Sequence, residues 1–421
     1  MSLTQLKGVV SAQLSDISLA NRWDRPQGYK AFLKICLPLT ASTMASSIML
    51  FTDRLFLSRY SMDSIAAALP AGVIKFSITA IFMGVASYTG VFAAQYTGAK
   101  LPQRAAASLW QGIYFSLFFG LLLSLLYFAS PWIFRSVGHH PTVAVLEDQY
   151  FRILILGSAP ELVMVAMSSF LASLGRAKTV MWVSIGGALL NIPLNYLLIF
   201  GVTIGGEVWI AEMGVRGAAV ATVVSWTTAT VAFGFLIFNA KMERSHGIVS
   251  HRQLDPPLFL RLIKYGWPGG LQFFMEVFAY TFFAMAVGWL DAMTLATNNI
   301  VFSIEGMSFL PMLGAGQTVS ILVGQAIGRG APDEGAQSTK SGMVLISIYV
   351  VFMATIFVLI PNPLLAFFLD PNVNLAERNF ILTLGPNLLK FVAFYCLFDG
   401  VYLCCFGAIR GAGDIWFPML A

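Results

Sequence analysis

The chain has 421 residues, of which 57% are hydrophobic and only 11% are charged, with a formal net charge of +5. Because an ordinary soluble domain is about 25% charged, this composition excludes a large soluble domain and predicts an all-α integral membrane protein. The positive balance does not indicate nucleic acid as a partner, since in a membrane protein the positions of Lys and Arg matter more than their sum.

Residues 1–28 are polar and mixed in charge, without the apolar core and small-residue cleavage site of a signal peptide. We therefore predict a cytoplasmic N-terminal tail. The four cysteines all lie in apolar runs, which is typical of small core residues and not of a disulfide framework; they are Cys36, Cys396, Cys404 and Cys405.

Ten apolar segments follow, each long enough for the about 20 residues that a membrane-spanning helix needs. They cover residues 30–58, 63–98, 104–130, 146–174, 178–201, 213–239, 258–290, 293–329, 336–361 and 375–409, and an eleventh begins after Asp414. With the N-terminus inside, most of the 25 Lys and Arg residues fall in the cytoplasmic tail and loops, as the positive-inside rule requires. We expect a multi-pass, monomeric protein of the cell (inner) membrane, in contact with the lipid bilayer.

The chain repeats itself at a spacing of about 230 residues. Matched positions include Pro38 and Pro268, Ala66 and Ala296, Gly84 and Gly314, Gln95 and Gln325, and Gly98 and Gly328. Further along, the spacing grows to about 235, where SLGRAKT corresponds to AIRGAGD. The repeat covers six helices, an even number, so both halves share one orientation. This predicts two six-helix bundles related by a pseudo-twofold axis along the membrane normal.

The repeat also sets the predicted domain boundaries. Residues 29–240 form an N-lobe with helices 1–6, residues 241–257 a cytoplasmic inter-lobe linker, and residues 258–421 a C-lobe. The C-lobe contains helices 7–10 and the start of helix 11. We expect that most of helix 11 and all of helix 12 are missing from this sequence, so that the C-lobe is truncated.

Charged side chains inside the predicted helices are the first candidate functional residues, because an acid at a helix centre costs about 2.5–3.5 kcal/mol and usually faces a cavity. Glu276 and Asp399, both in the C-terminal half, are interpreted as functional and not as neutral buried carboxyls. They could share a proton or a Na⁺ ion, which would bind carboxylate oxygens. Glu161 is interpreted as structural.

Lys75 and Glu305 occupy equivalent positions in the repeat and carry opposite charges. We predict that they pair across the lobe interface in one state of a transport cycle and separate in the other. In the alternative, each has its own partner or extends to a surface.

The sequence contains neither a G-x-x-x-x-G-K-[ST] loop nor an H-E-x-x-H motif. A nucleotide-hydrolysing or redox enzyme is therefore disfavoured, and we expect no cofactor. Secondary transport, a channel and a lipid flippase remain.

Several segments, in their order along the chain, resemble the MATE (multidrug and toxic compound extrusion) family, most of all its bacterial NorM-like branch. They include FTDRLFLSRY, QYTGA, GRAKT, NIPLNYLLIFG, MGVRGAAVAT, WPGGLQFFMEV, VGQAIG and FDGVYLCCFGAIRGAGD. The resemblance extends from about residue 30 to the end. It implies a twelve-helix fold of two lobes around a central cleft that opens alternately to each side. It also implies export of organic cations and drugs in exchange for Na⁺ or H⁺.

The resemblance assigns site residues as well. The family's membrane carboxylates, cation-site aromatic, helix 5 amides and helix 6 threonine correspond here to Asp53, Glu276, Asp399, Tyr395, Asn191, Asn195 and Thr222. The archaeal branch has Asp where this chain has Asn195, so the N-lobe site is expected to be weaker or absent. Asp53 could instead form an interfacial pair with the adjacent Arg54. Asn191 and Asn195 share one helix face and could ligate a cation with Asp53 or bond helix to helix.

Together these features predict a cation-coupled exporter of hydrophobic organic cations, with Na⁺ at Glu276 and Asp399 or H⁺ as the coupling ion. Aromatic faces attract organic cations, and four aromatic residues flank Glu276 in the sequence: Phe273, Phe274, Phe278 and Tyr280. The main alternative is a flippase for lipid-linked saccharides. That function would favour a strongly cationic cleft, whereas acids outnumber lysines inside the helices. A channel is a further alternative.

Overall fold

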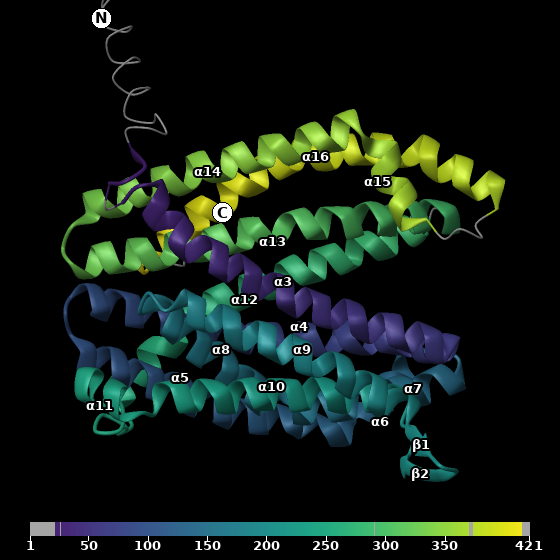
Figure 1. Ribbon diagram of the computed structural model, residues 1–421, viewed down its shortest axis with the longest axis horizontal. Helices are drawn as coiled ribbons and strands as arrows, with labels where there is room; N and C mark the ends of the chain where they lie inside the picture. Colours follow the sequence, from purple (N-terminus) through teal and green to yellow (C-terminus); the bar gives the residue numbers. More distant parts are fainter. Residues whose placement is uncertain (1–21, 26, 290, 370–373, 415–421) are drawn as a thin grey trace, which may run out of the picture. The chain divides into compact units, whose positions relative to one another are not determined.

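The computed structural model describes residues 22–25, 27–289, 291–369 and 374–414, which are almost entirely helical (Figure 1). The chain divides into two compact units. Of the described residues, those within 41–275 and 413–414 form one unit, here called the N-unit, and those within 22–40 and 276–412 form the other, the C-unit. Two long helices contribute to both units: α3 (Tyr29–Tyr60) and α12 (Pro256–Gly288).

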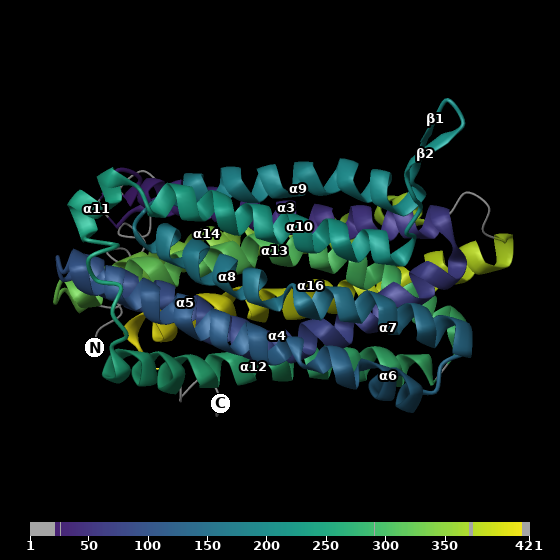
Figure 2. The same ribbon diagram turned by 90° about the horizontal axis from the view of Figure 1, so that it is seen from below.

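The N-unit consists mainly of helices that run along one another (Figures 1 and 2). Besides parts of α3 and α12 it contains α4 (Met62–Gly98), α5 (Pro102–Ser124), α6 (Leu126–Val137), α7 (Pro141–Leu156), α8 (Ser158–Ser173), α9 (Ala177–Phe200), α10 (Val215–Ile237) and α11 (Ala240–His246). One of its hydrophobic clusters includes Leu57, Phe134, Phe151 and Leu162, all at most 1% exposed.

A short antiparallel hairpin of β1 (Val202–Ile204) and β2 (Glu207–Ile210) joins α9 to α10. Gly205 and Gly206 form its turn with φ angles of 62° and 91°, a backbone region that glycine adopts without steric cost. This hairpin was not predicted from the sequence.

The C-unit contains α13 (Ala292–Gly328), α14 (Pro332–Leu359), α15 (Pro361–Phe368) and α16 (Leu375–Ala412), together with the start of α3 and the end of α12. Phe32 and Cys36 of α3 belong to its hydrophobic core. They pack there with residues such as Val319, Leu389 and Cys404.

Eight described helices are long and apolar enough to cross a membrane, and α7 with α8 provides a ninth span, bent by 47°. These nine and α12 correspond to the ten segments predicted from the sequence. The predicted eleventh helix, after Asp414, lies outside the described residues. The chain is therefore a multi-pass membrane protein, with the all-helical architecture that was predicted.

The internal repeat is visible in two helix crossings. A Cβ atom on Gly84 of α4 would lie 2.2 Å from the Cα of Gly270 of α12, so these backbones touch. In the C-unit, a Cβ on Gly314 of α13 would lie 2.3 Å from Oγ1 of Thr40 of α3. Gly84 is equivalent to Gly314 in the repeat, and Thr40 is equivalent to Gly270. The start of α3 therefore belongs to the C-unit and the start of α12 to the N-unit, so the chain passes from one unit to the other within α3 and within α12.

The segment predicted as the inter-lobe linker is fixed to α5 by side-chain hydrogen bonds to its backbone. Trp110 Nε1 donates to the carbonyl oxygen of Ile248 at 2.6 Å. The amide of Gln111 donates to the carbonyl oxygen of Gln253 and accepts from the backbone N–H of Asp255, both at 3.2 Å. We call residues 247–255 the strap.

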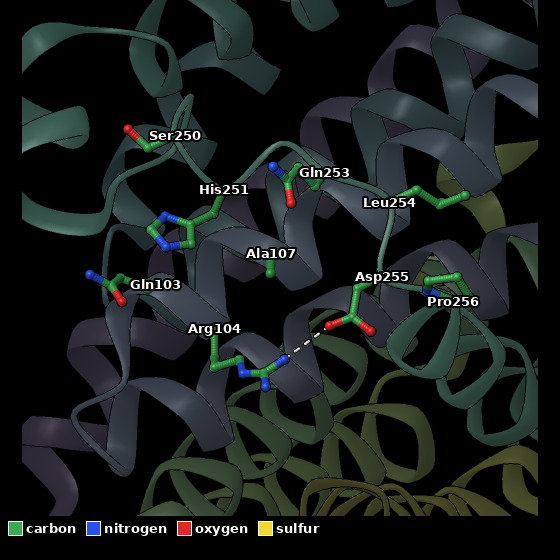
Figure 3. A pocket seen from close by; sticks show the side chains of 9 residues that line it. All are labelled: Gln103, Arg104, Ala107, Ser250, His251, Gln253, Leu254, Asp255 and Pro256. Atoms are coloured by element: carbon green, nitrogen blue, oxygen red, sulfur yellow. Dashed lines mark hydrogen bonds and ion pairs between the residues drawn. The ribbon is translucent and has the colours of Figure 1, made fainter.

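Two further contacts hold the C-terminal part of the strap. The hydroxyl of Tyr114 donates to the carbonyl oxygen of Arg252, and Arg104 Nη1 lies 2.9 Å from Oδ2 of Asp255 (Figure 3). Asp255 also accepts the backbone N–H of Leu258 at 3.1 Å, which caps the start of α12. The strap therefore connects the N-terminal half of α5 to the first turn of α12.

Candidate cation and substrate site

Asp53 of α3 is the centre of a buried polar network in the N-unit and is 2% exposed. Its Oδ1 accepts a hydrogen bond from Asn195 Nδ2 of α9, and its Oδ2 accepts one from Thr222 Oγ1 of α10 at 2.8 Å. Asn195 also donates to Oδ1 of Asn191, one turn away, at 2.7 Å. The structure thus brings together the four predicted residues of the N-terminal half on three helices.

The environment of Asp53 is not the one expected for an interfacial ion pair with Arg54. Both carboxylate oxygens of Asp53 point to donors inside the unit, whereas Arg54 is exposed. In the described part of the chain, Oδ1 of Asn195 is buried and has no hydrogen-bond partner. Because Na⁺ is a hard cation that would be ligated by carboxylate and amide oxygens, this free oxygen beside a carboxylate is a candidate ligand.

Lys75 of α4 forms a second buried cluster in the same unit. Its Nζ donates to Oε2 of Glu161 on α8, and the two side chains are 4% and 7% exposed. The ammonium also lies 4.3 Å from the ring centroid of Trp226, within the range of a cation–π interaction. Lys75 therefore has a partner in its own unit, and its predicted pairing with Glu305 in another state stays a prediction.

The C-unit holds a cluster of a different kind, formed by Glu305 of α13 with Cys396 and Asp399 of α16. One ligand atom from each of these three side chains lies within 4.8 Å of the other two. Cys396 is buried, while the two acids are half-buried. Two carboxylates and a thiol at this spacing can bind a proton or a metal cation.

Glu276 of α12 lies close to this cluster. Its Oε1 accepts a hydrogen bond from the hydroxyl of Tyr402 at 2.7 Å, and it interacts electrostatically with Asp399. Both Glu276 and Tyr402 are exposed in the structure. Tyr395 is half-buried and within electrostatic range of Glu305 and Asp399. The structure therefore gathers the predicted residues of the C-terminal half around one face of α16.

The clusters of the two halves are related by the repeat. Lys75 is equivalent to Glu305 at the spacing of about 230 residues, and Glu161 is equivalent to Cys396 at the later spacing of about 235. The N-unit therefore has an internal ion pair where the C-unit has a carboxylate beside a thiol. Among the ion pairs of the described residues, the acid of the N-unit thus has a lysine partner, whereas the two acids of the C-unit cluster have none.

Aromatic residues near Glu276 separate into two groups. Phe273 packs edge-on against Phe76 of α4, with ring centroids 5.6 Å apart. Tyr280 instead faces Phe302 of α13 at 4.8 Å, and Phe283 contacts the same ring at 5.8 Å. Because Tyr280 and Phe283 are about half exposed, they are the better candidates to contact an organic cation.

Two residues of this region were missed from the sequence, namely Cys396 of the cluster and Tyr402, which bonds to Glu276. The sequence does carry a signal, because Tyr395, Cys396, Asp399 and Tyr402 recur at helical spacing along one face of α16. Cys396 was assigned to the apolar core because its neighbours in the sequence are apolar. The presence of Glu305 beside it depends on the packing of α13 against α16.

Comparison with known proteins places the chain in a family. The MatE family model matches residues 38–197 and 268–421. The multidrug resistance protein NorM of Burkholderia vietnamiensis is 29% identical over 395 residues, which cover 92% of this chain and 82% of that protein. A probable multidrug resistance protein NorM of Rhizobium meliloti (strain 1021) is 27% identical over 423 residues, covering 99% and 87%.

Solved structures share the fold. One described as the outward-facing conformation of a multidrug resistance MATE family transporter of the MOP superfamily has a TM-score of 0.83 at 18% identity, covering 94% of this chain and 85% of that one. The eukaryotic MATE transporter AtDTX14 has a TM-score of 0.78 at 17% identity, covering 93% and 84%. The resemblance seen in the sequence is thereby confirmed: the chain belongs to the MatE family of multi-pass membrane transporters.

Proposed function

We propose that this transporter exports hydrophobic organic cations in exchange for Na⁺ or H⁺, and that the exchange takes place at Glu305, Asp399 and Glu276. The observation that carries the proposal is the cluster of Glu305, Cys396 and Asp399, whose ligand atoms lie within 4.8 Å of one another. Among the ion pairs of the described residues, none joins a lysine or arginine to Glu305 or Asp399.

The chemistry follows from the closeness of these charges. Two ionised carboxylates at this separation repel each other, and the repulsion is relieved by a proton, a Na⁺ ion or an organic ammonium group. These cations therefore compete for the same negative charge. Competition of this kind couples the release of one cation to the binding of another, because the binding of one cation lowers the negative charge that attracts the next.

Alternating access completes the proposed cycle. A coupling ion bound from one side of the membrane favours one conformation, and a drug bound from the other side favours the opposite one, as required for a population shift by differential affinity. Tyr280 and Phe283 are exposed beside Phe302, so they can cover the apolar part of an organic cation. Names of relatives that refer to multidrug resistance support this class of substrate.

The test is transport of ethidium by the protein in inside-out vesicles under an imposed Na⁺ gradient or pH gradient. Glu305→Gln and Asp399→Asn remove charge from the cluster, and Glu377→Gln removes an exposed acid from the first turn of α16 as the control. We expect transport to be driven by one of the two gradients, to be lost in the cluster variants and to continue in the control. Transport that is independent of both gradients, and equal in all variants, would instead favour a flippase.

A further inference from the structure

Lys100 has a backbone conformation that its residue type disfavours. It follows α4 with φ of 58°, the only described non-glycine residue with positive φ. The equivalent residue of the second half is Gly330, with φ of 70°. Both form the same helix-ending hydrogen bonds, from Lys100 N to Thr97 O at 3.1 Å and from Gly330 N to Ile327 O at 3.0 Å. The fold therefore needs a left-handed residue here, and only the second half uses the unstrained glycine.

The strain needs a compensating role for the side chain. A non-glycine residue in the left-handed region is strained because its Cβ crowds the following carbonyl oxygen, and a positive charge at an exposed helix C-terminus offsets only part of that cost. The difference is not offset by an ion pair, because no carboxylate of the described residues pairs with Lys100.

Lys100 lines a pocket of about 310 Å³ together with Thr97, Pro102 and His246. This volume is at the lower end of the range for small-ligand sites. The hydroxyl oxygen of Thr97 is buried and has no hydrogen-bond partner in the described part of the chain. An unpartnered hydroxyl in a pocket calls for a ligand or water, since burying a polar group without a bond is costly.

The charged surroundings of the pocket are basic. Arg176, in the loop before α9, is near enough to His246 to lower its pKa, although burial of the imidazole is the larger cause. The acid closest in sequence, Glu243, is already bonded to the backbone N–H groups of Val249 and Ser250. His246 is the last residue of α11, whereas Lys100 lies in the α4–α5 connection and Arg176 directly before α9. The helix α11 and the α4–α5 connection lie at the same end of the N-unit (Figures 1 and 2).

We propose that this pocket binds the phosphate group of an anionic phospholipid. Lysine, arginine and a free hydroxyl form charge-assisted hydrogen bonds to phosphate oxygens. The pocket lies between the ends of two membrane-spanning helices, α4 and α5. Leu101, next to Lys100, is 49% exposed, so an apolar surface for an acyl chain adjoins the basic group. A basic pocket beside membrane-spanning helices is the arrangement that recognises anionic lipid headgroups.

We expect Lys100→Gly to affect thermal stability and lipid binding differently. Glycine relieves the backbone strain, so the variant should unfold at a temperature equal to or higher than that of the wild type in lipid-free detergent. It should nevertheless bind lipid more weakly, by about fivefold for the loss of one charge near the surface. If Lys100 had only a structural role, Lys100→Gly would not combine an unchanged or higher unfolding temperature with weaker lipid binding.

The experiment measures thermal unfolding of the purified protein in detergent during titration with phosphatidylglycerol, phosphatidylcholine or inorganic phosphate at matched ionic strength. We expect phosphatidylglycerol alone to raise the unfolding temperature, with a weaker effect in Lys100→Gly and Arg176→Gln. Lys178→Gln, which removes an exposed charge two residues from Arg176, should behave as the wild type. Equal stabilisation of all variants, or an equal effect of phosphatidylcholine, would overturn the proposal. A full effect of inorganic phosphate would reassign the site to a soluble anion.

Discussion

Lys75 and Glu161 form a buried ion pair that links α4 to α8, with the lysine ammonium also facing Trp226. Removing one member of such a pair leaves an uncompensated charge and costs about 3–5 kcal/mol. We therefore expect Lys75→Met and Glu161→Leu each to lower the stability of the protein in detergent by about that amount.

The double variant Lys75→Met/Glu161→Leu should recover most of the loss, since an apolar pair of similar volume needs no charge compensation. Thermal unfolding of the four proteins gives the coupling between the two positions as a double-mutant cycle. If the two single effects add without recovery, the pair does not contribute as a unit. A different variant tests the predicted alternation with Glu305: a charge-swapped Lys75→Glu/Glu305→Lys protein that transports no better than either single variant would argue against it.

Thr222 is expected to stabilise the ionised form of Asp53 through its hydroxyl, which donates to Oδ2 at 2.8 Å. Thr222→Val keeps the shape of the side chain and removes the donor, so stability should fall by about 1.5–3 kcal/mol, the value for a hydrogen bond to a charged group. Thr222→Ser retains the hydroxyl and serves as the matched control. Equal unfolding temperatures of the Val and Ser variants would show that the bond contributes nothing.

The helical architecture could be predicted because the sequence features that indicate it are either local to one segment or repeated along the chain. Apolar segments, the spacing between Pro38 and Pro268, and the positions of membrane carboxylates need no knowledge of packing. The passage of α3 and α12 from one unit to the other could not be predicted, since it depends on close contacts such as Gly84 with Gly270. The hairpin at 202–210 was missed although Gly205 and Gly206 are a recognisable turn signal.

Only part of the candidate site could be predicted from the sequence. Asp53, Asn195 and Thr222 were assigned by resemblance, and the structure joins them in one hydrogen-bond network. Glu161 was interpreted as structural from its place after Pro160, but its partner Lys75 lies 86 residues away in the sequence and could not be identified. Cys396 was missed because the polar environment of a thiol depends on the neighbouring helix.

Cys396 makes the C-unit cluster sensitive to thiophilic metal ions. A thiolate with two nearby carboxylates binds a soft divalent cation such as Cd²⁺ more tightly than carboxylates alone. We expect Cd²⁺ to inhibit transport by the wild type, and Cys396→Ser to require at least about tenfold more Cd²⁺ for the same inhibition. Cys405→Ser removes an exposed thiol from the same helix and should leave the inhibition unchanged. Loss of sensitivity in Cys405→Ser instead would place the effect outside the cluster.

Tyr114 is expected to protect the strap from proteolysis, because its hydroxyl holds the carbonyl oxygen of Arg252. Tyr114→Phe removes this bond and retains the ring, so trypsin should cleave after Arg252 several times faster. The site is exposed, and cleavage therefore reports local opening of the backbone. Thr227→Val removes an exposed hydroxyl that bonds only within α10 and is the control. Unchanged cleavage in Tyr114→Phe would show that the other contacts suffice.

Glu243 gives the strap a dependence on pH. Its carboxylate accepts hydrogen bonds from the hydroxyl of Ser250 and from the backbone N–H of Val249 at 2.6 Å, and these lower the pKa of Glu243 from its ordinary value of 4.5, with the Ser250 hydroxyl contributing most. Because the pKa is lower in the folded protein, the carboxylate stabilises the strap above the ordinary value. This contribution is lost as the pH falls through the lower folded value.

Hydrogen exchange of residues 247–252, expressed as protection factors that are normalised for the intrinsic pH dependence, tests this link. Between pH 7 and pH 5 the wild type should exceed Glu243→Gln in protection by a constant factor, and the factor should shrink toward one at more acidic pH. Ser250→Ala removes the strongest donor to the carboxylate, so the loss should begin at a higher pH in that variant. A difference between the wild type and Glu243→Gln that stays constant down to pH 3 would mean that ionisation of Glu243 does not fix the strap.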